Sequence, residues 1–478
     1  MILFWSVVLK MLVETTLYLA KKLSASGALF REKIRALPPV DRASVGFFLA
    51  ALALVAFDQV YWVFYWQTPN YLAVLAAMGA LGGLIYRIST AQTGASVYPD
   101  RPVDRRVEVW STFAVFIAFL AWYSVTGSIE RSPYNAHVRQ AIAFLHLHTD
   151  IERSPGIEQV VFAGRYFQLH PPLPAFLLMP FVAIWGMDTN QTAFSLVAGA
   201  IDAALAWWLL GRLRLSVSAR VWLTVFFGAG TVMWFESLNG GSWDVTQIVA
   251  VGFTLGALGE VFGAARPAVV GLLAGLASLA RNDLALDFPI FVGLCYVQRR
   301  DWRELLWIAP GFALAGVVYV SLNEARFNSV FDLGQFLYTP NIPTFAVSFL
   351  PQNLDTLLFM QPRIDVRFPF IHPSPSGQAL TFTSPAFVLA LRASLANITP
   401  LLLFIGSVLA MGPSLFFNNN GGAQFGTRHY IHSFPFLLVL MAKGLPAGYA
   451  DQLTKILILA SLGLIGVGVL HLRLWGFG

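Results

Sequence analysis

The stretch that decides the fold reads TGSIERSPYNAHVRQ (Thr126–Gln140), then HLHTDIERSPGIEQVVFAGRYFQLH (His146–His170), then PPLPAFLLMPFVAIWG (Pro171–Gly186). A polar segment rich in His, Arg, Glu and Tyr is thus enclosed by apolar segments. A passive connector between apolar segments does not need so many ionisable side chains. We therefore interpret this stretch as one wall of a functional site at a membrane surface.

The composition of the chain indicates a polytopic, all-α membrane protein. Of its 478 residues 57% are hydrophobic and 12% are charged, whereas soluble domains carry about 25% charged residues. Many apolar segments approach the roughly 20 residues that a membrane-spanning helix needs. The lipid bilayer is therefore an expected partner. A single cysteine, Cys295, excludes an intrachain disulfide.

Basic residues set the expected orientation of the helices. The net charge of +6 comes from Lys and Arg in short loops, as the positive-inside rule predicts, and does not indicate a nucleic-acid partner. Residues 1–110 are expected to form an interfacial helix and a helical hairpin, Ser44–Trp66 and Tyr71–Tyr86. Residues 111–478 are expected to form the transmembrane core, in which Ser111–Val125 crosses outward.

Arginines at 212, 214, 220 and 266 belong inside, but four apolar segments lie between the first outer loop and Ala265. Four full crossings would leave the last of these arginines outside. The simplest solution makes Pro171–Gly186 re-entrant, helped by its prolines. The prediction is then about 11–14 transmembrane or re-entrant helices with three outer loops, 127–170, 323–383 and 414–430.

Two shorter outer segments, 236–244 and a break at 281–283, should join these loops. Within the first loop, Tyr134, Val138, Ile142 and Leu145 recur at helical spacing, which predicts an amphipathic helix lying in the interface. A second short element, Glu158–Phe167, should precede His170.

Charged groups collect on this outer side. An arginine can bind a lipid phosphate bidentately, and a carboxylate can deprotonate an acceptor hydroxyl. The alternative interpretation is that these groups are solvated loop charges. The histidines of the first loop do not form a metal motif, since His146 and His148 point apart on a helix and no HExxH or DxD pattern occurs. We expect neither a metal nor a cofactor.

Four segments resemble GT-C glycosyltransferases, in particular the protein O-mannosyltransferase and aminoarabinose transferase superfamily. They are GRYFQLHPPLPAFLLMPFVAIWG (Gly164–Gly186), GLLAGLASLARNDLAL (Gly271–Leu286), NEARFNSVFDLG (Asn323–Gly334) and QFGTRHYIHSFPFLLVL (Gln424–Leu440). The last two resemble uncharacterised bacterial members. The resemblance implies a GT-C-like fold in a bacterial inner membrane with its active site on the outer face. It also implies inverting transfer of a sugar from a polyprenyl-phosphate donor to a glycan, lipid or protein acceptor.

The family usually carries its base early in the first outer loop, where this chain reads SPYNAH (Ser132–His137). SPYNAH contains no Asp or Glu, so the base must lie elsewhere in the loop. The expected base is Glu158, which lies close to the membrane entry, or else Glu130. The expected substrate-binding residues are Tyr134, Asn135, His137, Arg165, Tyr166, His170, Arg281, Asp283, Gln424, Arg428 and His429. Of these, Arg281, Arg428 and Arg165 would hold the lipid phosphate.

Two other functions remain open from the residues alone. A transporter or lipid flippase would use acids inside the spans, for which Asp58, Asp202 and Glu260 are candidates. A non-catalytic assembly protein would leave Glu158, Arg281 and Arg428 far apart.

Overall fold

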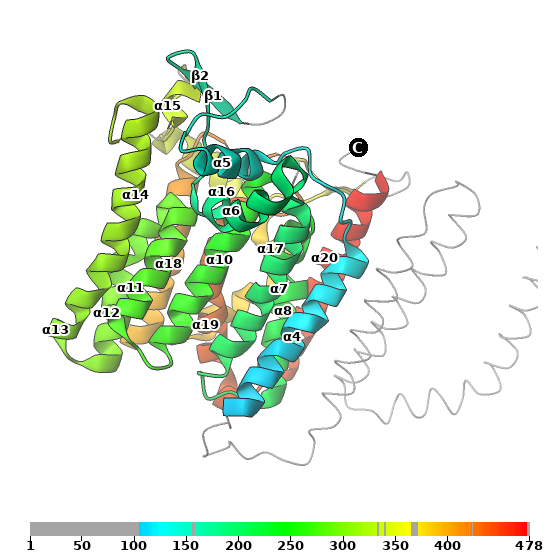
Figure 1. Cartoon of the computed structure of the whole chain (residues 1–478). Helices are drawn as coiled ribbons and strands as arrows, with labels where there is room; N and C mark the ends of the chain where they lie inside the picture. Colours follow the sequence, from blue (N-terminus) through cyan, green and yellow to red (C-terminus); the bar gives the residue numbers. More distant parts are fainter. Residues whose placement is uncertain are drawn as a thin grey trace, which may run out of the picture.

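The computed structural model describes residues 105–154, 158–331, 334–338, 341–364, 371–419, 421–422 and 424–475. The predicted hairpin near the N-terminus, together with Asp58, lies outside the described residues. The described part is mostly helical, with two small two-stranded sheets (Figure 1). The all-α fold class is thus confirmed.

Six helical stretches in the described residues are long and apolar enough to cross a membrane, which is compatible with an integral membrane protein. They are α4 (Arg105–Thr126), α7 (Gln191–Leu210), α10 (Ser242–Val261), α13 with α14 (Trp302–Leu305 and Ala309–Phe327), α18 (Ile398–Leu415) and α20 (Gln452–Trp475). The prediction of 11–14 transmembrane or re-entrant helices was larger than six because it included shorter apolar helices and part of residues 1–104.

Shorter helices fill the spaces between the long ones. They are α6 (Leu173–Trp185), α8 (Val217–Ala229), α9 (Met233–Leu238), α11 (Pro267–Ala280), α12 (Phe288–Arg299), α15 (Gln335–Tyr338), α16 (Leu350–Leu358), α17 (Leu380–Thr383) and α19 (Phe434–Gly444). Segments of 3-10 helix occur at Gly186–Asp188, Asn282–Asp287, Leu306–Ile308, Val347–Phe349, Pro385–Arg392, Arg428–Ser433 and Pro446–Gly448.

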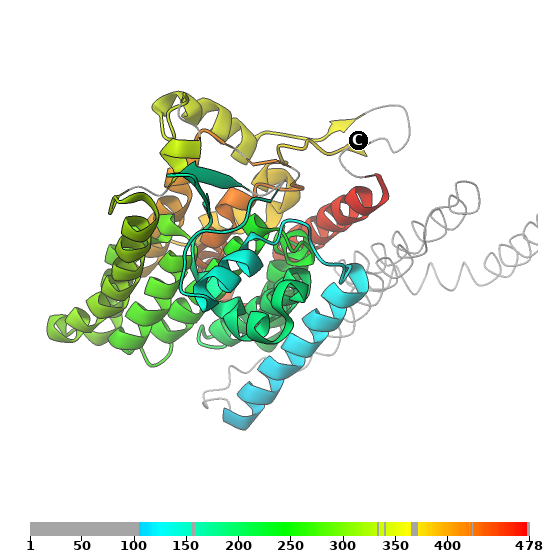
Figure 2. The same ribbon diagram turned by 45° about the horizontal axis from the view of Figure 1, so that its top comes forward.

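The bundle has two distinct ends. At the loop end, where α5 (Ala136–Leu145) and both strands of the first sheet lie, the predicted outer segments come together (Figures 1 and 2). At the far end, Glu108 of α4 pairs with Arg220 of α8 at 2.6 Å, and Arg392 pairs with Asp451 at 3.0 Å. The helices alternate between these ends in the order that the basic loops predicted.

Helix α6 begins and ends at the loop end. It follows His170, which packs beside His137 of α5. Beyond its C-terminus, Asn190 caps α7 and donates a hydrogen bond to the carbonyl oxygen of Ile129. Pro171–Gly186 therefore does not run the length of the bundle, which is the geometry that the arginine count required.

The first loop departs from the prediction of several amphipathic helices. After α5 it forms a β-hairpin, β1 (Gln159–Phe162) with β2 (Arg165–Gln168). The turn uses positive φ at Ala163 and Gly164, as two-residue hairpins require. Val160 and Phe167 face each other and are buried. Branched and aromatic residues at alternate positions thus favour strands here over a second helix.

The predicted apolar face of α5 is also wrong in detail. Tyr134 and Leu145 are 41% and 39% exposed, whereas Val138 is buried against α6. The buried side of α5 includes polar residues, His137 and Gln140. These two polar side chains face the protein interior because they meet polar groups of neighbouring segments.

The close contact between α11 and α14 depends on glycine. A Cβ atom on Gly271 of α11 would lie 2.2 Å from the carbonyl oxygen of Ile308. Gly311 of α14 faces Gly271 equally closely. Small residues let the two backbones approach, so α11 and α14 pack tightly near the far end.

Candidate functional site

Arg428 lies at the centre of the candidate site. It opens the 3-10 segment before α19, and its side chain is almost fully buried. Nη1 donates a 2.8 Å hydrogen bond to the carbonyl oxygen of Gly422, and the guanidinium lies 5.3 Å from the ring of Trp243. Its charge acts on groups from three other segments, which the next paragraphs describe.

Glu158 faces this arginine from the start of the hairpin. Its Oε2 lies 3.8 Å from Nε2 of His170. Burial raises the pKa of Glu158, and the positive charge of Arg428 opposes that shift. A carboxylate with a raised pKa is better matched to general-base work near neutral pH than an exposed one.

His170 stays neutral at neutral pH. Burial, with the positive charges of Arg428 and Arg281, lowers the pKa of His170 to about 4. The contact with Glu158 is therefore not an ion pair near pH 7. His170 therefore lies beside Glu158 and within electrostatic range of both arginines.

His137 links α5 to α10. Its Nε2 lies 2.9 Å from both the carbonyl oxygen of Ser242 and the hydroxyl of Thr246, and Gln168 approaches its Nδ1. Burial, with the neighbouring His170, lowers the pKa of His137 to about 3. His137 therefore positions the first loop against α10, and its ring nitrogens are occupied by protein groups.

Arg281 and Asp283 lie at the junction of α11 and α12, where the sequence predicted two half-spans to meet. The guanidinium donates two hydrogen bonds to the carboxylate, at 2.8 and 3.3 Å. Asp283 also lies 3.1 Å from Nε2 of His432. Much of the charge of Arg281 is therefore balanced within the protein.

A buried carboxyl pair was missed as a site feature. Glu236 of α9 and Asp244 of α10 face each other and are almost fully buried. Neither oxygen of Glu236 has a donor partner among the described residues, so the two groups can hydrogen-bond only if they share a proton. Burial and the neighbouring Asp244 raise the pKa of Glu236. The short outer segment 236–244 was the sequence signal for this pair.

Beside the pair lies a cavity of about 420 Å³. Its lining includes Asp244, Glu130, Tyr134 and Trp243. The ring of Tyr134 lies 4.9 Å from that of Trp243, so the residue that packs near Arg428 also lines this cavity. Glu130 itself is exposed, which makes it a weaker base candidate than Glu158.

Five other predicted residues lie at the edge or serve the scaffold. Exposed Arg165 is 3.9 Å from Asp150, and Tyr166 pairs with Val161 in the hairpin. Asn135 accepts a hydrogen bond from Arg139. The remaining two hold or flank the Arg428 segment. Gln424 donates to Ser376 and accepts from the Arg428 amide. His429 is half-buried, and its pKa is lowered by burial of the ring and by Arg428.

A further arginine lies within Asn323–Gly334 and was not among the expected site residues. Arg326 lies in the last turn of α14 and is 7% exposed, yet its Nε and Nη2 donors have no partner among the described residues. It acts electrostatically on Tyr319, as does Arg281. Unfilled, buried guanidinium donors are well suited to a phosphate or carboxylate ligand.

Glu260 and Asp202, the two described acids that suggested transport, differ in whether their carboxylates have a partner. Glu260 makes two hydrogen bonds with the Arg266 side chain, at 2.8 and 2.9 Å, at the far end of α10. It is therefore a paired acid and does not support transport. Asp202 of α7 is 2% exposed, and its Oδ2 has no partner among the described residues.

The described residues contain no group of three or more metal-ligating side chains. Comparison with family models, curated proteins and solved structures finds no match to the chain. The functional argument therefore starts from the side chains themselves.

Proposed function

We propose that the chain is an integral membrane glycosyltransferase that moves a sugar from a polyprenyl-phosphate donor to an acceptor hydroxyl, with inversion. One observation carries the proposal. Carboxyl groups and arginines from four separate segments, around Glu158, Glu236–Asp244, Arg281 and Arg428, meet at one end of an apolar bundle. A lipid donor can reach such a site from the bilayer, while the acceptor arrives from the loop side.

Glu158 is the base in this proposal. Its raised pKa and its position beside Arg428 suit removal of a proton from a hydroxyl. Arg428, Arg281 and Arg326 would meet the phosphate, which leaves with the lipid. Arg165 is too exposed and too far out on the hairpin to be favoured. The cavity lined by Tyr134 and Trp243 offers space for a sugar against aromatic rings.

The test is donor turnover by the purified full chain in lipid nanodiscs. Undecaprenyl-phosphate mannose, glucose and aminoarabinose are supplied with an envelope extract as acceptor. Release of undecaprenyl phosphate and labelling of the extract are measured. Glu158→Gln should lower turnover about 10²–10⁴-fold, as expected for loss of a general base. Glu152→Gln, an exposed acid in the same loop, should leave turnover unchanged.

Further variants separate the roles. Arg326→Gln and Arg428→Gln should both raise the KM for donor, because each removes a charged donor to phosphate. Full activity in both Glu158→Gln and Glu130→Gln would sink the base assignment. Loss in Asp244→Asn, with Glu158→Gln active and both variants folded, would move the base to the buried pair.

A transporter is the second candidate, because Asp202 is a buried acid in the middle of a long helix, and its Oδ2 has no partner among the described residues. The same nanodisc preparation distinguishes the two functions. No transfer with any donor, together with lipid or solute flux that Asp202→Asn abolishes, would favour transport.

A further inference from the structure

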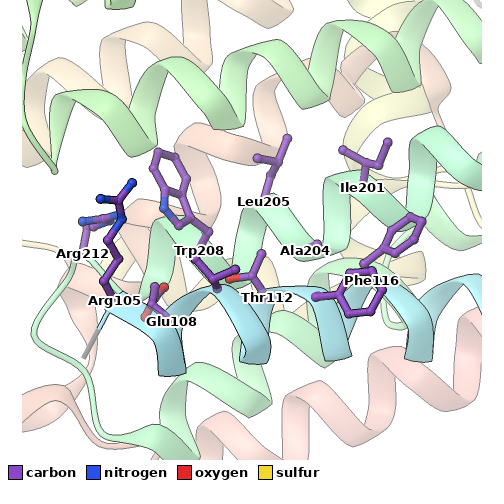
Figure 3. Close-up of a pocket in the computed structure, with 12 residues that line it drawn as sticks. Arg105, Glu108, Thr112, Phe116, Ile201, Ala204, Leu205, Trp208 and Arg212 are labelled. Atoms are coloured by element: carbon purple, nitrogen blue, oxygen red, sulfur yellow. The ribbon is translucent and has the colours of Figure 1, made fainter. Parts of the chain in front are cut away.

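A groove at the far end of the bundle lies well away from the candidate site. It measures about 950 Å³ and runs between α4 and α7. Figure 3 shows its two walls, with Phe116 and Ile201 toward one end and Arg105 and Arg212 at the other. Neither the base, the phosphate-binding arginines nor the acceptor cavity contributes to it.

The walls of the groove are apolar. Val109 and Phe113 of α4 are 58% and 51% exposed, and Ile201 of α7 is 44% exposed. Apolar surface alone is expected wherever a helix faces lipid, so it does not define a ligand. The charged end of the groove is the distinctive feature.

Two arginines at that end carry charge that the groove does not balance. Glu108 is the acid in the lining, and it is held by Arg220 through hydrogen bonds of 2.6 and 3.3 Å. Arg105 and Arg212 are both exposed, and the described residues place no acid within ion-pair distance of either. Arg212 lies 4.9 Å from the ring of Trp208. The mouth of the groove therefore carries two net positive charges beside an aromatic ring, as at a membrane interface.

The length of the groove indicates one leaflet. From Arg105 to Phe116, and from Ile201 to Arg212, the walls advance about 16 Å at 1.5 Å per residue. The hydrocarbon core of a bilayer is about 30 Å thick. The groove thus matches an acyl chain of a single leaflet, with the headgroup at the arginines, whereas a polyprenyl chain would overrun it.

We infer that this groove binds an anionic glycerophospholipid of the inner leaflet, with its phosphate between Arg105 and Arg212 and an acyl chain along Phe113 and Ile201. The inference rests on the membrane placement in the proposed function but not on sugar transfer. Lipid binding is therefore measured without any donor or acceptor, so that failure of the transferase assay does not decide it.

The experiment is native mass spectrometry of the full chain in detergent, titrated with phosphatidylglycerol or phosphatidylethanolamine of the same acyl composition. Wild type should retain one phosphatidylglycerol selectively. Arg105→Gln with Arg212→Gln should weaken that binding about thirtyfold, taking ~1 kcal/mol for each arginine. Arg300→Gln with Arg303→Gln is the matched control, because both arginines lie near aromatic rings at the far end but outside the groove.

Ile201→Trp fills the groove without changing charge and should also displace the lipid, with thermal unfolding as the check on folding. Equal loss in the two double variants would show a general effect of surface charge and overturn the proposal. So would selective retention of undecaprenyl phosphate, or a wild-type chain that binds neither lipid because another segment of the chain fills the groove.

Discussion

Acid should destabilise the folded chain through His170. Its ordinary pKa is about 6.5, and in the folded protein burial and two nearby arginines lower that pKa to about 4. Between these values the unfolded chain binds a proton that the folded chain does not. Stability is therefore retained above about pH 6.5 and is lost as the pH falls toward 4.

The size of the effect follows from the two pKa values. At about pH 5 the ratio of protonated to neutral His170 is about thirty to one in the unfolded chain. In the folded chain the same ratio is about one to ten. The difference amounts to ~2 kcal/mol at His170 alone. His137, with its pKa of about 3, and His429, whose pKa is also lowered by burial, shift stability in the same direction, so the wild type should lose more stability than His170 alone accounts for.

The assay compares thermal unfolding midpoints of the detergent-solubilised chain, followed by tryptophan fluorescence, at about pH 7.5 and about pH 5. His170→Gln should lose ~2 kcal/mol less stability on acidification than wild type. His148→Gln changes an exposed ring in the same loop and should behave like wild type. A parallel acid loss in wild type and His170→Gln would refute the reasoning, whatever the absolute stability of the variant.

Two further predictions concern packing and catalysis. Gly271→Ala should destabilise the chain by about 1–3 kcal/mol, because the new Cβ meets backbone atoms of Ile308. Gly316→Ala, whose Cβ meets nothing within 4 Å, should be neutral or slightly stabilising. Equal midpoints for the two variants would contradict this. In the transfer assay, kcat/KM should fall as the pH drops through the raised pKa of Glu158, and Arg428→Gln should move that acid limb to higher pH, because Arg428 opposes the shift. An acid limb that does not move would argue against Glu158 as the titrating group.

Much of the helix arrangement could be predicted from the sequence because it depends on long-range physical rules. Apolar length and the arginine count gave the order in which helices alternate between the two ends, and the prolines of 171–186 marked the segment that does not cross the bundle. The hairpin at 159–168 was missed as strands because its period-two pattern spans only four residues on each side. A short element of this kind is decided by its contacts, here Val160 against Phe167.

The site was predicted unevenly for a similar reason. Glu158, His170, Arg281 and Arg428 were recognisable as charged groups bordering apolar segments, and the structure places His170 beside Glu158 and within electrostatic range of both arginines. No sequence pattern distinguished them from Arg165 or Asn135 of the first outer loop, whose side chains contact Asp150 and Arg139 instead. The Glu236–Asp244 pair could not be recognised as a pair, because nothing in one sequence shows that two carboxyl groups from different helices share a buried space.

Charge balance points to where an anionic phosphate would bind. The Glu236–Asp244 pair, holding one proton, leaves a single negative charge, and Arg428 lies close enough to neutralise it. Arg281 is already engaged by Asp283. Among the described arginines of the loop end, Arg326 combines burial with two donors that have no partner. A phosphate therefore gains most at Arg326. Arg428 and Arg281, whose charges are already partly balanced within the protein, would meet the same phosphate and gain less from it.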